Sequence, residues 1–215
     1  MPTTPQDSSA DWNWLGPLFE YSGCLTFARG MIPEEMLRAF DLDPATAEEL
    51  TLDETMRTLG VPGFDDPPFW VRAAELGEWS VAIELGQAKG YLDGIETDLS
   101  IETEVLTMVF LLVKPPQFRL LDRYGVVTDM TLGEGYETRS GAEPHALDPA
   151  LAEAGLLDFT THPSYGTAFS RAAAAIATQL EIDLDADTFT GPMLTATRDH
   201  PYVYGRDPLT TRTWS

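Results

Sequence analysis

The side chains best suited to proton transfer in this sequence are three histidines, and their positions do not predict a catalytic centre. His145, His162 and His200 each lie beside a proline, in three separate stretches that are typical of loops. Nucleophilic catalysis needs a serine or cysteine next to a base that a third group orients. The strongest local candidate is Ser164, but its segment lacks the first glycine of a nucleophile elbow. We therefore predict that Ser164 caps a helix.

The other groups that could bind a metal or a cofactor fail on spacing. Cys24 is the single cysteine, has only Arg29 as a nearby cation, and is typical of a small buried apolar residue. Asp183, Asp185 and Asp187 alternate as in a calcium loop, but the glycine and the final glutamate of that loop are missing. No glycine-rich phosphate or dinucleotide motif occurs. The sequence predicts no catalytic residue, no metal site and no cofactor.

The charge balance is the strongest compositional signal. The 215 residues include 35 acidic and 13 basic side chains, which gives a formal net charge of −22. Such a chain repels phosphate backbones and anionic membranes, whereas it attracts basic proteins and accelerates their association. We therefore expect a basic protein as partner, and neither nucleic acid nor a membrane. Acidity that serves only solubility is the alternative interpretation.

Two stretches concentrate this negative charge. One spans residues 41–54, and the other holds five acidic residues within a dozen positions that contain no basic side chain. Clustered like charge is typical either of a solvated loop or of a docking surface for a basic partner. The second stretch supplies the candidate docking residues, Asp93, Glu96, Asp98, Glu102 and Glu104.

The sequence also indicates a compartment. A single cysteine excludes an internal disulfide and fits a reducing environment. Residues 1–10 have neither the basic start nor the apolar stretch of a signal peptide. The longest apolar run, 105–113, has about half of the roughly 20 residues that a membrane helix needs. We predict a cytoplasmic protein.

The elements that must position these residues follow from periodicity and from capping signals. The opening third predicts helices: one with Pro33 in its first turn, a short one after Asp43, and one that opens with the capping box of Thr51 and Glu54 and ends at Gly60. The apolar period then changes to two, which predicts strands. About five strands are expected, at Phe69–Leu76, Glu78–Leu85, Glu104–Val113, Phe118–Arg123 and Val126–Leu132.

The third of these strands is apolar on both faces. It suits a central strand that is covered on each side, or an exposed face through which a second copy binds at Val105–Val113. Helices return in the last third, near Pro149–Ala154, from Ser164 to about Leu180, and near Asp185–Phe189.

This order of elements predicts an α+β fold, in which N-terminal and C-terminal helices pack against an antiparallel sheet of about five strands. We expect a flexible N-terminus over 1–10, a single domain over 11–197, and a C-terminal arm over 198–215.

Several segments resemble an uncharacterised family of actinobacterial proteins, a domain of unknown function. The resemblance covers most of the chain, and it rests on residues 24–38 (CLTFARGMIPEEMLR), 79–84 (WSVAIE), 103–105, 151–156 (LAEAGL) and 191–192. Eleven arginines against two lysines are consistent with such a source. The family has no established activity, so the resemblance implies no catalytic residues.

The leading functional hypothesis is a non-enzymatic, acidic protein-binding module, such as a partner or immunity-type inhibitor of a basic protein. The alternative is a small-molecule-binding protein or enzyme with a pocket between sheet and helices, where side chains such as Arg72, Arg119 or His162 would converge. A third hypothesis is an acidic mimic of nucleic acid, whose carboxylates would be spaced like phosphates on one face.

Overall fold

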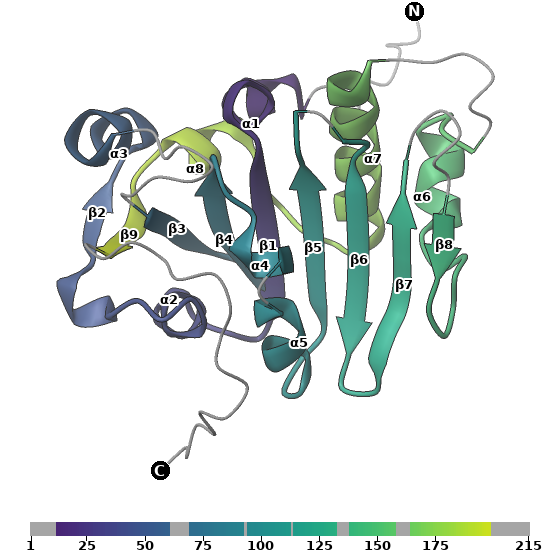
Figure 1. Cartoon of the computed structure of the whole chain (residues 1–215), viewed down its shortest axis with the longest axis horizontal. Coiled ribbons are helices and arrows are strands. Elements are labelled where there is room, and N and C mark those ends of the chain that lie inside the picture. The colour runs from purple at the N-terminus through teal and green to yellow at the C-terminus, as the bar shows by residue number, and fades with distance from the viewer. Residues whose placement is uncertain are drawn as a thin grey trace, which may run out of the picture.

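The chain folds around one nine-stranded antiparallel sheet, with helices on both of its faces (Figure 1). The computed structural model describes residues 12–60, 69–92, 94–112, 114–132, 138–157 and 164–198. Neighbouring strands follow the order β2-β9-β3-β4-β1-β5-β6-β7-β8. The strands are β1 Gly23–Arg29, β2 Glu48–Leu50, β3 Phe69–Leu76, β4 Trp79–Leu85, β5 Val105–Phe110, β6 Gln117–Asp122, β7 Gly125–Thr131, β8 Thr138–Ser140 and β9 Met193–Arg198.

The helices between these strands are mostly short. The longest is α7, with 15 residues, and none in the described ranges combines the length and apolarity needed to cross a bilayer. They are η1 Trp12–Leu15, α1 Gly16–Tyr21, α2 Pro33–Ala39, η2 Pro44–Thr46, α3 Leu52–Leu59, α4 Lys89–Leu92, α5 Ile95–Ser100, α6 Asp148–Glu153, α7 Tyr165–Gln179 and α8 Ala186–Thr190.

The predicted antiparallel sheet with packed helices is confirmed, but the expected number of about five strands is wrong. The strands that the sequence did not predict are β1, β2, β8 and β9. The largest omission is β1, which lies at the centre of the sheet between β4 and β5. Six of its seven residues are buried, so it lacks the alternation that marks a half-exposed strand. β2 and β8 have only three residues each, too few to show a period.

The predicted strands that the structure does contain lie close to their expected bounds. β3 and β4 form the expected hairpin, in which Leu76 and Trp79 flank a two-residue turn that begins with Gly77 at φ 65°. β5 pairs with β1 on one side and β6 on the other, and all six of its residues are buried. β5 is therefore a central strand that is covered on each side, the first of the two interpretations. Leu112, which follows β5 in the same apolar run, is 55% exposed, and binding of a second copy at Val105–Val113 stays a prediction.

One face of the sheet packs against α7. Apolar side chains that point to this face form one large cluster, in which the ring centre of Phe169 on α7 lies 5.7 Å from that of Phe110 and 5.5 Å from that of Phe118. Four consecutive alanines of α7, residues 172–175, are buried, because α6 and η1 cover the helix from the outside. Small side chains let the helix fit between these two layers.

The opposite face packs against α2, α4 and α5, which lie on the near side of the sheet in Figure 1. Its apolar residues form two smaller clusters, one under α2 and α5 and one under α4. Polar side chains lie between them: Thr26, Glu84, Glu96 and Thr107 are all fully buried. These side chains need hydrogen-bond partners inside the protein, and they include both of the fully buried carboxylates in the described residues.

Candidate functional site

The structure separates the acidic residues that the sequence predicted as a docking surface. Asp93 lies outside the described residues. Glu96 is fully buried and does not reach the surface. Glu104 lies just before β5, and its carboxylate is 3.2 Å from the guanidinium of the last residue of β1. Asp98 and Glu102 are exposed, and both line one groove.

That groove lies between α2 and α5 and encloses about 240 Å³. Met31, Ala39 and Leu99 form its apolar part. Three carboxylates and one guanidinium supply its charged groups, from Glu35, Asp98, Glu102 and Arg38. We call it the α2–α5 groove. Its charge is negative and its floor is apolar, which suits a partner that has both a cationic and an apolar side chain.

Local sequence explains why these side chains face the groove. In α2, Met36 and Leu37 are buried against the sheet, so Glu35 and Arg38 point outward. The Glu35 carboxylate also accepts the N–H of Ile32, at 3.1 Å, which satisfies a free donor at the start of the helix. Proline at the first position fixes the beginning of α2.

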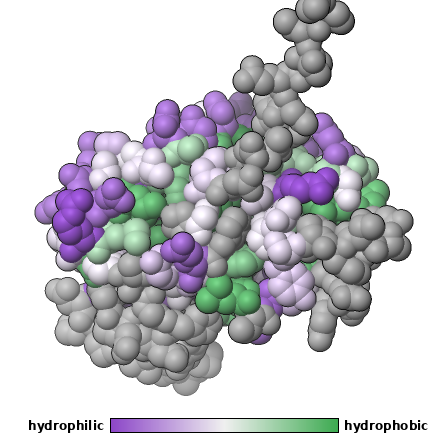
Figure 2. All heavy atoms as spheres, turned by 90° about the horizontal axis from the view of Figure 1, so that it is seen from above, coloured by the Kyte–Doolittle hydropathy of each residue, from purple (hydrophilic) through white to green (hydrophobic). Residues whose placement is uncertain are grey.

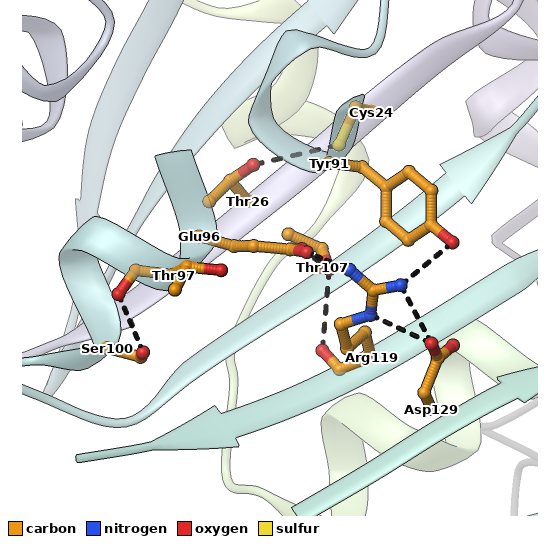
Figure 3. A network of polar contacts seen from close by, with 9 residues as sticks. All are labelled: Cys24, Thr26, Tyr91, Glu96, Thr97, Ser100, Thr107, Arg119 and Asp129. Carbon is orange, nitrogen blue, oxygen red and sulfur yellow. Dashed lines mark hydrogen bonds and ion pairs between the residues drawn. The ribbon is translucent and has the colours of Figure 1, made fainter. Parts of the chain in front are cut away.

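Beneath α5, Glu96 points away from solvent and into the sheet (Figure 3). Its Oε2 accepts a hydrogen bond from the hydroxyl of Thr107 on β5, at 2.6 Å, and its Oε1 pairs with the guanidinium of Arg119 on β6. A buried carboxylate that lost these partners would be strongly destabilising. The contacts of Glu96 therefore tie α5 to two strands.

Arg119 extends this ion-pair network from α5 to β7 and α4. Its Nε and Nη2 donate to the Asp129 carboxylate at 3.0 and 2.7 Å, and Nη2 also donates to the Tyr91 hydroxyl at 3.0 Å. The guanidinium carbon lies 4.3 Å from the centre of the Tyr91 ring. Every nitrogen of Arg119 thus has an acceptor, and the side chain positions four elements rather than presenting a free cation to a substrate.

The protonation states of the network follow from burial. Removal from water raises the pKa of Glu96, although the Thr107 hydrogen bond and the Arg119 charge both lower it. Burial also raises the pKa of Tyr91. The tyrosine is therefore neutral at physiological pH and donates or accepts hydrogen bonds as a phenol.

Next to this network, a second buried carboxylate fixes α4. Glu84 accepts the backbone N–H of Lys89 at 2.8 Å and of Gly90 at 2.9 Å, at the first turn of the helix. Cys24 lies beside it, with its sulfur 3.6 Å from the Thr26 hydroxyl. Burial and the nearby Glu84 raise the pKa of the Cys24 thiol well above its ordinary value. The thiol stays protonated, as expected of a small buried apolar residue.

The two arginines that were predicted to mark a pocket lie on opposite faces of the sheet. Arg119 belongs to the α4 and α5 face, whereas Arg72 on β3 points to the α7 face. The Arg72 guanidinium donates to the backbone carbonyls of Phe189, Gly191 and Leu50 at 2.5 to 3.1 Å. Burial lowers its pKa to about 10. Both arginines therefore cannot line the same cavity.

Two of the three histidines, His162 and His200, lie outside the described residues. His145 is exposed, and its Nδ1 lies 2.8 Å from the Asp148 carboxylate. Within the described ranges, no group of three histidine, cysteine or acidic side chains could hold a metal ion. The predicted cap is confirmed, because the Ser164 hydroxyl accepts an N–H at the start of α7.

Asp185 is a helix cap as well. Its carboxylate accepts the Thr188 N–H at 2.7 Å at the start of α8. The other acidic stretch, 41–54, includes one further cap, Asp43, and the capping-box partner of Thr51, Glu54. Asp43 accepts the Ala45 N–H at 2.9 Å, and Glu54 accepts the N–H and hydroxyl of Thr51. These carboxylates therefore have local structural partners.

The model of a family of unknown function (DUF6461) matches residues 5–191. The chain belongs to this family. The match confirms the resemblance to a family without an established activity, and it includes the α2–α5 groove and the whole ion-pair network. No curated protein and no solved structure matches the chain.

For this family member, two signals in the sequence could have revealed the ion-pair network. Residues four apart lie on the same face of a helix, so a helix over 95–100 places Ile95 above Leu99 and Glu96 above Ser100. The apolar pair Ile95 and Leu99 marks the buried face, and Glu96 lies next to it. Arg119 is paired with Asp129 across the β6–β7 hairpin. That hairpin was predicted, but its register was not, and opposite charges at paired inward positions indicate a cross-strand ion pair.

Proposed function

We propose that this protein is a non-enzymatic binding protein that docks a basic partner protein, as an immunity-type inhibitor would. The observation that carries the proposal is the α2–α5 groove, in which Glu35, Asp98 and Glu102 border an apolar floor. Two of these residues come from the acidic stretch that the sequence predicted as a docking surface.

The physical basis is a combination of long-range and short-range attraction. The net charge of −22 steers a basic protein toward the surface from any direction. Figure 2 shows hydrophilic side chains at several separate places on the face that it draws, so overall charge alone selects no docking site. The groove adds an apolar contact in which a partner side chain leaves water, and buried apolar contacts supply affinity that rim charges do not.

The alternative, an enzyme or small-molecule binder with a pocket between sheet and helices, has weaker support. Arg119 is held by Glu96, Asp129 and Tyr91, and Arg72 by backbone carbonyls on the other face. Neither guanidinium is presented to a shared cavity.

We also propose that the protein works in a reducing cytoplasm, and that its source is an actinobacterium. The first proposal is supported by the single, buried Cys24. The second is supported by the strong preference for arginine over lysine.

The test is affinity capture with matched charge variants. The groove variant carries Asp98→Asn and Glu102→Gln, and the control variant carries Asp187→Asn and Glu153→Gln. Both variants lose two negative charges. The pairs are matched because Asp98 and Asp187 are exposed in the first turn of a short helix, and Glu102 and Glu153 are exposed at or just after a helix end. Immobilised protein is incubated with lysate of the source organism at low and high salt.

We expect the wild type and the control variant to retain the same basic proteins at low salt, and the groove variant to lose them. High salt should weaken the capture, because it screens the exposed charges. If the two variants retain identical sets of proteins, capture depends on net charge alone, and the proposal is wrong.

A further inference from the structure

A second hollow lies across α2 from the α2–α5 groove. It encloses about 390 Å³ between the start of α2, the end of β3 and the start of β9. Three glutamates line it, Glu34, Glu49 and Glu75, and none of the described residues around it is basic. We call it the β3 hollow. Its charged groups are all negative, so its complement is a cation.

The pairing between β3 and β9 ends at the β3 hollow. β9 pairs with β3 only over Phe69–Ala73, although β3 continues to Leu76. Leu76 flanks the two-residue turn, so its backbone N–H and C=O bond to β4. Backbone groups of successive residues in a strand point to alternate sides, so those of Glu75 point away from β4, toward the side of β9. Continuing the register of β9 places Pro192 opposite Glu75, and proline has no N–H to donate. The ladder between β3 and β9 therefore ends beside the β3 hollow, whose lining includes both Glu75 and Pro192.

The two hollows are neighbours, because adjacent residues of one segment line them. Met31 and Glu35 face the α2–α5 groove, whereas Ile32 and Glu34 face the β3 hollow. The ridge between them is the start of α2, and Ile32 on this ridge is 48% exposed. A helix with its side chains is about 10 to 12 Å wide, which sets the separation of the two hollows.

We propose that the two hollows bind one extended basic segment of the partner, which crosses the start of α2. An apolar side chain of this segment enters the α2–α5 groove, and an arginine or lysine side chain enters the β3 hollow. An extended chain rises about 3.3 Å per residue, and residues an even number apart point to the same side, so the two side chains are about four positions apart. This inference rests on the proposed function and specifies the chemistry of the partner.

The volumes agree with these assignments. A cavity of about 240 Å³ accommodates one large apolar side chain and is smaller than the sites of most drug-sized ligands. The larger β3 hollow leaves space for a long cationic side chain and for the backbone that carries it. Arg38 offsets part of the negative charge of the groove, whereas no described residue that lines the β3 hollow offsets its three carboxylates, so a partner cation is favoured more strongly across the ridge.

The inference is tested with two fluorescein-labelled peptides of identical composition on a glycine and serine background. Each contains one leucine and one arginine, which are four positions apart in the first peptide and adjacent in the second, with the same flanking lysines. Binding to the full-length protein is measured by fluorescence anisotropy at low salt. We expect the spaced peptide to bind roughly five-fold tighter, the effect of one favourable charge contact.

Three variants test whether the preference for the spaced peptide depends on the β3 hollow. Glu34→Gln with Glu75→Gln should remove the preference for the spaced peptide, and so should Glu49→Gln with Glu75→Gln, which leaves the first turn of α2 unchanged. Asp187→Asn with Glu153→Gln, which changes net charge equally, should preserve it. Thermal unfolding of each variant confirms that it is folded.

The outcomes separate this inference from the proposed function. If both peptides bind equally well, and binding depends on Asp98 and Glu102 but not on Glu34, Glu49 or Glu75, the proposed function stands and the two-hollow inference is overturned. If neither peptide binds in a way that depends on Asp98 and Glu102, the groove is not a docking site, and both proposals fail. A spacing preference that survives in the β3-hollow variants also overturns the inference.

Discussion

The two faces of the central sheet are both covered by helices, yet they are held together by different interactions. On one face, the 15-residue α7 contributes a continuous surface of alanine, isoleucine and phenylalanine to one large apolar cluster. On the other face, α2, α4 and α5 have seven, four and six residues, and buried carboxylates lie beneath two of them. Isolated helices of this length are unstable in water, so they need tertiary contacts to persist.

This difference indicates a division of roles. The α7 face stabilises the fold by burying apolar surface, which is not directional. On the other face, Glu84 holds the N-terminus of α4, and Glu96 ties α5 to β5 and β6. Hydrogen bonds and ion pairs are directional, so they determine where these short helices lie. The position of α5 in turn shapes one wall of the α2–α5 groove.

The largest effect on stability should come from the α7 face. Phe169 is fully buried against Phe110 and Phe118. Phe169→Ala should lower the free energy of unfolding by roughly 3 to 5 kcal/mol, because it removes an aromatic side chain and leaves a cavity. Urea denaturation measures the change. A loss below about 1 kcal/mol would mean that this face is not the main apolar core.

Loss of the Arg119 guanidinium should have the next largest effect on the free energy of unfolding. Arg119→Met leaves Glu96 buried without its ion-pair partner, and should cost roughly 3 kcal/mol by urea denaturation. The double variant Glu96→Leu with Arg119→Met removes both charges and should recover most of that loss. If the double variant is as unstable as the single one, the network contributes packing rather than charge compensation.

A smaller effect should appear in the pH dependence of stability. Burial raises the pKa of Glu96 in the folded protein above its ordinary value of 4.5, so the folded state holds this proton more tightly than the unfolded state does. The resulting stabilisation is fully present below about pH 4.5 and is lost as pH rises through the raised pKa. Relative to Glu96→Gln, the wild type should therefore lose stability between pH 4 and neutrality. Urea denaturation of both proteins over this range gives the difference, and an increase with pH would contradict the assignment.

The same contrast between the faces explains which parts of the fold the sequence could predict. Signals carried by a few neighbouring residues were sufficient for the capping box of Thr51, the cap at Ser164 and the turn at Gly77. β1 was missed because both of its faces are buried, and the run from Cys24 to Ala28 has no period. Its pairing with β4 and β5, up to 87 positions away along the chain (Gly23 with Phe110), leaves no local signal.

The candidate site was predictable in part for a similar reason. Exposure of Asp98 and Glu102 agrees with the general rule that charged residues face water. Glu96 breaks this rule, since its burial depends on Arg119, which lies 23 positions later. The groove was not predictable, because it forms only where α2 and α5, separated by about 60 residues along the chain, pack side by side.

The smallest effect on stability should come from the rim of the groove. Asp98→Asn with Glu102→Gln changes exposed side chains and should alter the free energy of unfolding by no more than about 0.5 kcal/mol. At low salt the variant should even be slightly more stable, because two negative charges leave a chain that carries a net charge of −22. The same substitutions should abolish partner capture, so binding and stability separate at this site. A destabilisation above about 1 kcal/mol would instead show that the rim carboxylates stabilise the fold. Their presence in the groove would then be explained without a partner.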